Sequence, residues 1–99
     1  MSYKIILNSK AKREMGDSFD WYEKRVKGLG ERFFSSVNNK LIEIAANPLR
    51  YSIKKHNYRE VRTKTFPFNI VYEVYEDEQI VLILHVFHLK RNPIGKYKK

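Results

Sequence analysis

Cysteine is absent from this chain of 99 residues. Its absence excludes a disulfide framework and any metal site built on thiolates. Long apolar runs are absent too: the opening segment MSYKIILNSK holds only three consecutive large aliphatic residues, too few for a signal peptide. No stretch approaches the roughly 20 apolar residues that a membrane-spanning helix needs. We therefore expect a cytoplasmic protein that does not act on a membrane.

Glycine and proline are scarce, with four and three residues, and this scarcity argues against a disordered chain. Hydrophobic residues make up 42% of the sequence, which suffices for a modest core. Two domains would each be too small to bury a core of their own. Residues 1–99 are therefore expected to form one domain without repeats or linkers.

Acidic residues are few beside the basic ones: 11 Asp and Glu face 20 Lys and Arg, and the formal net charge is +9. The excess is concentrated in residues 50–99, which carry eleven basic side chains and five acidic ones. Such a surface attracts an anionic partner, namely nucleic acid, an anionic membrane or an acidic protein. The plain alternative is a basic surface that only keeps the protein soluble.

Apolar periodicity predicts two helices. In the first, Asn8 or Ser9 is expected to cap the N-terminus, and apolar residues recur every three or four positions over residues 11–26. A second apolar stripe covers residues 29–45 and ends at Asn47-Pro48, because the residue before a proline disfavours helix. The connection between the two stripes includes Lys27-Gly28 and is short, which implies an antiparallel hairpin.

Four β-rich segments complete the predicted architecture, at residues 3–9, 59–66, 68–75 and 79–88. The basic segment 49–58 is expected to be a connection that is partly strand. The fold class is thus α+β in the order β-α-α-β-β-β. We expect a small, mostly antiparallel, twisted sheet with the helical hairpin packed on one face. The other face would be a concave surface toward which Arg62 and Lys64 point.

Two histidines stand in the last of these strands, His85 and His88. Being three residues apart, they point to opposite faces of a regular strand and cannot share one metal ion. Further zinc ligands are missing from their neighbourhood, so neither a metal nor a cofactor is expected. His88, which precedes two basic residues, is the better functional candidate. The other histidine is interpreted as a hydrogen-bonded core residue on the same side as Val81, Ile83 and Phe87.

Basic side chains gather in two parts of the chain, with tyrosines between them. They include Lys54, Lys55, Arg59, Arg62, Lys64, Lys90 and Arg91, with Tyr97 near the end. Lysine and arginine bind phosphates, and tyrosine can stack on unpaired bases. A metal-free ribonuclease would need a base, an acid and cations around the phosphate, and His, Lys, Arg and Tyr can serve. A solvated basic face is the simpler alternative.

Five short motifs occur in order along the hairpin and the strands: WYEKR (21–25), GLGERF (28–33), NP (47–48), FPFNIVYEV (66–74) and VFHLKRNP (86–93). Together they resemble the RelE/ParE superfamily of toxins from type II toxin–antitoxin modules, which include plasmid-stabilisation systems. The resemblance covers nearly the whole chain. It implies a small sheet with a helical hairpin on one face, in agreement with the periodicity. It also implies a partner antitoxin, which we expect to be acidic and partly disordered.

The resemblance leaves two kinds of activity open. RelE-like toxins are endonucleases that cleave mRNA in the ribosome without a metal, whereas ParE-like toxins poison DNA gyrase and are not known as nucleases. For a RelE-like chain, the expected partners are the ribosome and its mRNA instead of gyrase. Its catalytic set, carried over from the resemblance, would be Arg62, His88, Lys54 and Lys55.

One position separates the branches. RelE-type nucleases carry an arginine immediately before the apolar LVY of the central strand, whereas this chain has Asn69 there. This departure favours the ParE-like branch, as do Phe66-Pro67-Phe68 and the His88-x-x-Arg91 pattern. In either branch we expect the functional surface to include Arg59, Lys64, Asn69, Lys90, Arg91 and Tyr97.

Overall fold

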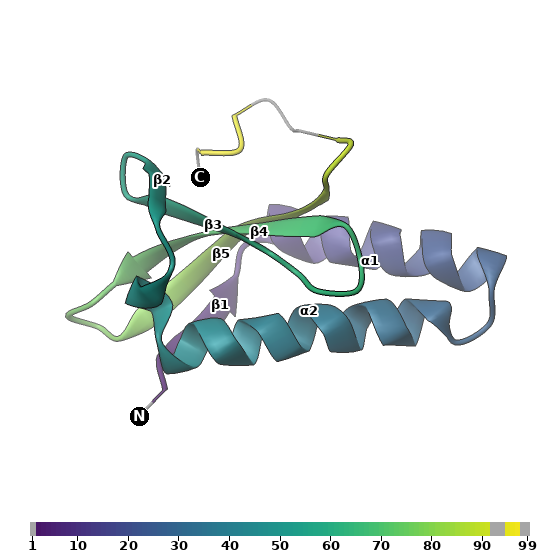
Figure 1. Ribbon diagram of the computed structural model, residues 1–99, viewed down its shortest axis with the longest axis horizontal. Helices are drawn as coiled ribbons and strands as arrows, with labels where there is room; N and C mark the ends of the chain where they lie inside the picture. Colours follow the sequence, from purple (N-terminus) through teal and green to yellow (C-terminus); the bar gives the residue numbers. More distant parts are fainter. Residues whose placement is uncertain (1, 92–94, 98–99) are drawn as a thin grey trace.

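The computed structural model describes residues 2–91 and 95–97 and contains two long helices and a five-stranded sheet (Figure 1). The predicted α+β class and the order of its elements are confirmed. The basic segment 49–58 contains a short strand, as expected, and a 3₁₀ turn at its start. The elements are β1 (Lys4–Leu7), α1 (Ser9–Arg25), α2 (Leu29–Ala46), η1 (Pro48–Arg50), β2 (Ile53–Lys55), β3 (Tyr58–Arg62), β4 (Phe68–Tyr75) and β5 (Ile80–His88).

The strands lie in the order β1-β5-β4-β3-β2. β1 runs parallel to β5, with Lys4 opposite Ile80 and Leu7 opposite Ile83, and the other pairs are antiparallel. The last strand of the chain therefore lies between the first strand and β4. The predicted mostly antiparallel sheet is confirmed.

The two helices cover one face of the sheet and bury the main core. Its centre consists of fully buried side chains from the two helices and from β4 and β5, among them Phe33, Ile44, Ile70, Tyr72 and Ile83. A second, smaller cluster lies on the other face and is formed by Val71, Leu84 and Phe87, with Tyr58 and Tyr97 packed against it. Neither helix is long and apolar enough to cross a membrane, within the part of the chain that the structure describes.

Local interactions fix the start of the helical hairpin and its turn. Asn8 caps α1, because its Oδ1 accepts a hydrogen bond from the backbone N–H of Ala11 at 2.9 Å. α1 ends at Arg25, two residues before the predicted Lys27-Gly28 end. Gly28 then adopts a left-handed φ of 86°, a conformation that costs glycine little.

The carboxylate of Glu23 fixes the connection between the helices. Its oxygens accept the backbone N–H groups of Gly28 at 2.8 Å and Gly30 at 3.0 Å, which would otherwise be unpaired at the start of α2. α1 and α2 approach so closely here that a Cβ on Gly30 would lie 2.8 Å from the backbone oxygen of Phe19. The motifs WYEKR and GLGERF thus describe one tight inter-helix turn.

The third strand is shorter than predicted. β3 ends at Arg62 instead of Phe66, because Thr63 turns the chain: its Oγ1 donates to the Phe66 oxygen at 2.6 Å, and its N–H donates to the Phe68 oxygen at 2.9 Å. The expected alternation over 59–66 is therefore wrong beyond residue 62. Lys64 lies in the connection beside α2 and does not point from the opposite face of the sheet.

A bulge interrupts the pairing of β4 with β5. Val71 lies opposite His85 but Tyr72 lies opposite Ile83, so Leu84 is an extra residue on β5. The bulge shifts the alternation, and Phe87 joins Leu84 in the second cluster. The expectation that Phe87 shares a side with Val81 and Ile83 is therefore wrong.

Candidate functional site

A buried carboxylate lies on the sheet face opposite the helices, on the strand next to the central one. Glu60, on β3, has a side chain that is only 8% exposed. One of its oxygens accepts the hydroxyl of Tyr97 at 2.6 Å and lies 3.4 Å from the ammonium of Lys96. The other accepts the side-chain amide of Asn69 from β4. This network ties the segment 95–97 to the middle of the sheet.

The ionisation of both partners follows from this contact. Burial acts to raise the pKa of the Glu60 carboxyl, but the hydrogen bonds from Tyr97 and Asn69 and the charge of Lys96 outweigh it, so the pKa lies below its ordinary value. Burial and the bond to Glu60 raise the pKa of the Tyr97 hydroxyl to about 12. The carboxylate is therefore charged and the tyrosine neutral at physiological pH. The Tyr97 ring is also nearly parallel to that of Tyr58, with centroids 6.2 Å apart.

A groove of about 670 Å³ lies at the C-terminal end of β5, between that strand and α1. His88, Lys90 and Arg91 line it together with the indole of Trp21, which is 45% exposed. The His88 ring packs edge-on against Phe68, a helix-side core residue, at 5.3 Å. Nδ1 of His88 accepts the backbone N–H of Lys90 at 3.0 Å. The basic end of β5 thus adjoins an exposed aromatic surface.

His85, on β5, is held by a carboxylate from α1. It is 5% exposed, and its Nδ1 lies 3.1 Å from an oxygen of Glu14 on α1. The second oxygen of Glu14 accepts the backbone N–H of Val86 at 2.9 Å. This N–H lies past the last pair of β1 with β5, Leu7 with Ile83, so β1 does not bind it. The interpretation of His85 as a hydrogen-bonded core residue is confirmed.

The described residues contain no group of three or more His, Cys, Asp or Glu side chains arranged to hold a metal ion. Residues 5–93 match the family described as "ParE toxin of type II toxin-antitoxin system, parDE".

The chain belongs to the ParE toxin family.

Solved structures agree with the ParE fold. A chain from the chromosomal ParDE system of P. aeruginosa has a TM-score of 0.75 and 11% identity, over 88% of this chain and 96% of that one. A chain of the intact E. coli RelBE complex has a TM-score of 0.67 and 16% identity, over 88% and 96%. The isolated E. coli RelE toxin has a TM-score of 0.68 and 15% identity, over 97% and 94%. No curated protein sequence matches the chain. At these identities the likeness concerns the fold, which ParE and RelE toxins share.

The residues that a RelE-like reading would make catalytic are not gathered in this ParE family member. Lys54 and Lys55 are exposed on β2, the edge strand. Arg62 is exposed at the end of β3, opposite Asn69 in the register. His88 packs on the helix side of the sheet, against Phe68. Three separate places in the fold hold the four side chains.

The remaining surface candidates also divide. Arg59 donates through its guanidinium to the backbone oxygens of Tyr51 and Leu49, so it holds η1 against the sheet. Asn69 and Tyr97 meet at Glu60, and Lys90 and Arg91 meet in the groove beside Trp21. Lys64 faces α2.

Three residues of these sites were not singled out from the sequence as functional. Glu60 is the one acid within the basic stretch 50–64, and that isolation was an available signal. Glu14 carries no local signal, because its partners lie 71 and 72 residues away. Trp21 enters the sequence analysis only as part of the WYEKR motif, and its exposure favours contact with a partner over packing in the core.

Proposed function

We propose that this ParE family toxin arrests growth by poisoning DNA gyrase in the cytoplasm, as ParE-like toxins do. Support comes from one observation above the others: the open sheet face carries the buried Glu60 carboxylate, held by Asn69. A ribonuclease needs cations there to stabilise the charge that develops on the phosphate. Glu60 instead engages the ammonium of Lys96 and the hydroxyl of Tyr97, two groups that could otherwise act on a phosphate. The candidate acids and bases also stand in separate parts of the fold.

The groove beside Trp21 is the surface we propose for contact with gyrase. It combines an exposed indole with two basic residues, Lys90 and Arg91, and two acidic ones, Glu14 and Asp17. Aromatic and arginine side chains supply most of the binding energy in many protein interfaces. The guanidinium of Arg25 stacks over the same indole at 3.4 Å from its centre and restricts its orientation.

Purified toxin should inhibit supercoiling by gyrase and increase the amount of DNA cleaved in gyrase complexes. Arg91→Ala should raise the concentration needed for half-inhibition about tenfold or more, as expected for an interface arginine. Arg13→Ala removes the same charge from an exposed position on α1 outside the groove and should change it little. Normal supercoiling with excess toxin would count against gyrase as the target.

The second candidate function is a ribosome-dependent, metal-free mRNA endonuclease. Its specific support is Arg62, an exposed cation on the same sheet face as Tyr97 and Glu60. Message on translating ribosomes would then be cleaved at defined positions, and Arg62→Ala would abolish the cleavage. Intact message in the presence of toxin that inhibits gyrase would remove this candidate.

We further propose a cognate antitoxin that is acidic and folds on binding. The net charge of +9 suits an acidic segment, and the exposed Trp21 in the groove suits the apolar side of an amphipathic one. Growth arrest on expression of the chain should be relieved by co-expression of a small acidic reading frame encoded next to it. Growth without arrest would instead identify an inactive binding module.

A further inference from the structure

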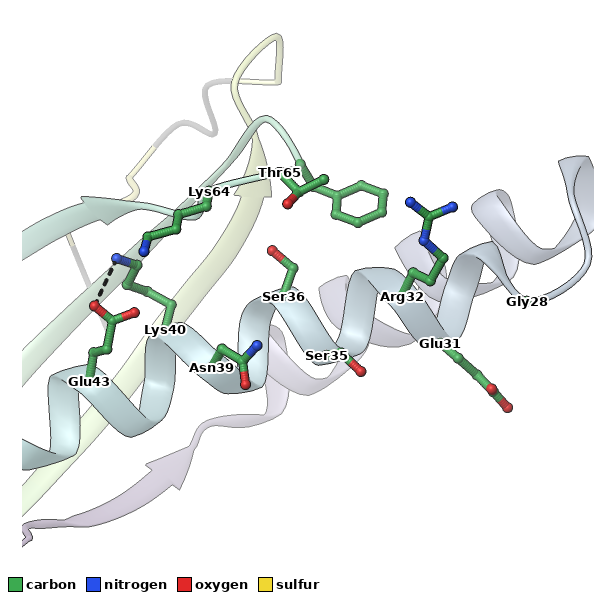
Figure 2. A pocket seen from close by; sticks show the side chains of 11 residues that line it. Gly28, Glu31, Arg32, Ser35, Ser36, Asn39, Lys40, Glu43, Lys64 and Thr65 are labelled. Carbon is green, nitrogen blue, oxygen red and sulfur yellow. Dashed lines mark hydrogen bonds and ion pairs between the residues drawn. The ribbon is translucent and has the colours of Figure 1, made fainter.

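A second cavity, of about 460 Å³, lies between α2 and the connection from β3 to β4 (Figure 2). Its size falls within the range of small-molecule sites, about 300–1,000 Å³. It is distinct from the groove beside Trp21, since the two share no lining residue. Polar and cationic side chains line much of it, among them Arg32, Ser36, Asn39, Lys40, Lys64 and Thr65.

Positive charge exceeds negative charge in this cavity. Arg32, Lys40 and Lys64 line it, and of the two lining carboxylates Glu31 points away in Figure 2. Glu43 pairs with Lys40 at 3.4 Å. Among the described residues, no carboxylate lies within ion-pair distance of Arg32 or Lys64. Two cations are thus left without a counter-charge.

Lys40 is the buried member of the set. Its side chain is 9% exposed, and its ammonium has Glu43 as its one ion-pair partner among the described residues, with the Tyr51 ring 5.9 Å away. An ammonium carries three N–H donors, so Lys40 keeps donors to spare inside the cavity. A buried charge is costly unless it is fully paired, and a bound anion would supply the missing acceptors.

Lys64 is brought to the same cavity by the turn that shortens β3. The two hydrogen bonds of Thr63, to the Phe66 and Phe68 oxygens, fix the backbone on which Lys64 stands. Figure 2 shows its side chain extending toward Lys40, and both line the cavity. Two ammonium groups that approach each other repel, and an anion between them reverses the sign of that interaction. The hydroxyl of Ser36 also points into the space between the helix and the turn.

We propose that this cavity binds a phosphate group, either free or as the monoester of a small molecule such as a nucleotide. A phosphate monoester carries a charge of about −1.5 to −2 at neutral pH, enough to attract both ammonium groups at once. Lys40 and Lys64 provide positive charge and donors at one end of the cavity, and Ser36 and Thr65 can donate from their hydroxyls. Arg32, eight positions before Lys40 on α2, lies toward the other end in Figure 2 and can bind another part of the ligand.

The test is a titration of the ¹⁵N-labelled full chain, followed by NMR, with inorganic phosphate and with adenosine 5′-monophosphate. Sodium chloride at equal ionic strength is the reference. Saturable shifts at the amides of Ser36, Asn39 and Thr65 are expected. Shifts with both ligands identify the phosphate group as the recognised element, and shifts with the nucleotide alone identify an ester. Absence of saturable shifts with either ligand overturns the proposal.

Two variants locate the site. Lys64→Gln, at an exposed position that should not affect folding, is expected to weaken binding about tenfold, as for one lost charge-assisted hydrogen bond. Lys24→Gln removes the same charge from an exposed position on α1 and should leave the affinity unchanged. Equal weakening in both variants would mean diffuse attraction to a basic surface, and would overturn the assignment.

Discussion

Gly16 and Gly30 both lie inside helices, and their replacement by alanine should change stability in opposite directions. A Cβ on Gly16 would meet nothing within 4 Å, so Gly16→Ala gains only the helix preference of alanine, about 0.5–1 kcal/mol. A Cβ on Gly30 would lie 2.8 Å from the Phe19 oxygen and 2.9 Å from its ring. Since the first of these atoms is backbone, the helices must separate.

The cost of Gly30→Ala can be estimated from two contributions. Overpacking of a tight contact costs about 1–3 kcal/mol. The same movement lengthens the bond from the Gly30 N–H to the Glu23 carboxylate, and hydrogen bonds to charged groups contribute about 1.5–3 kcal/mol. After the helix preference of alanine is subtracted, we expect a net loss of about 1.5–5.5 kcal/mol. In a domain of this size that lowers Tm by about 6 °C or more, whereas Gly16→Ala should raise it by about 2–8 °C.

Thermal unfolding followed by circular dichroism, with urea denaturation as a second measure, checks both values. Gly28→Ala is the matched control, because its Cβ would meet nothing within 4 Å but its φ is 86°. It should cost only the left-handed conformation, about 1–2 kcal/mol. If Gly30→Ala proved as stable as Gly16→Ala, the close approach of α1 to α2 at Phe19 would be refuted.

Other predictions concern the buried polar contacts. The lowered pKa of Glu60 means that its contribution to stability is present above the ordinary value of 4.5 and is lost as the pH falls through the folded-state pKa. In Glu60→Gln, the free energy of unfolding, measured by urea denaturation, should therefore fall less steeply with decreasing pH at acid pH. The ultraviolet titration should show a tyrosine that ionises at about pH 12 and disappears in Tyr97→Phe; an unchanged titration would contradict the bond to Glu60. Glu14→Ala should cost about 2–3 kcal/mol by leaving the buried Val86 N–H unpaired, and Glu14→Gln should cost less because it keeps an acceptor. Asn8→Ala should cost about 1 kcal/mol and Asn8→Ser almost nothing, measured by thermal unfolding; equal losses would exclude a side-chain cap.

The parts of this fold that follow from the sequence are those set by neighbours in the chain. Asn8 begins α1 and Asn47-Pro48 ends α2, and each acts through atoms within about one helical turn. The apolar stripes also predicted the two helices and their buried face, because the period of an amphipathic helix is a local property of the sequence. The assignment of His85 to the core succeeded because a continuous apolar run surrounds it.

The errors arise where a distant partner decides. The bulge at Leu84 depends on how β5 pairs with β4, and no local pattern encodes an extra residue. β3 looked longer because Thr63 and Thr65 fit the alternation of a strand, whereas the Thr63 hydroxyl binds the Phe66 oxygen and turns the chain. The network at Glu60 joins residues 37 positions apart, beyond any spacing rule.

The position of β5 determines when the toxin can become folded during synthesis. β5 is synthesised last among the strands, yet both β1 and β4 pair with it. Lys4 in β1, for example, can pair only after Ile80 has been synthesised. Until that strand is available, β1 has no neighbour in the sheet and α1 has no β5 surface to cover. Contacts between the two ends of a chain form late because closing a long loop is entropically costly. A nascent chain that stops before Ile80 is therefore expected to lack the complete sheet, and the folded toxin can appear only after β5 has been translated.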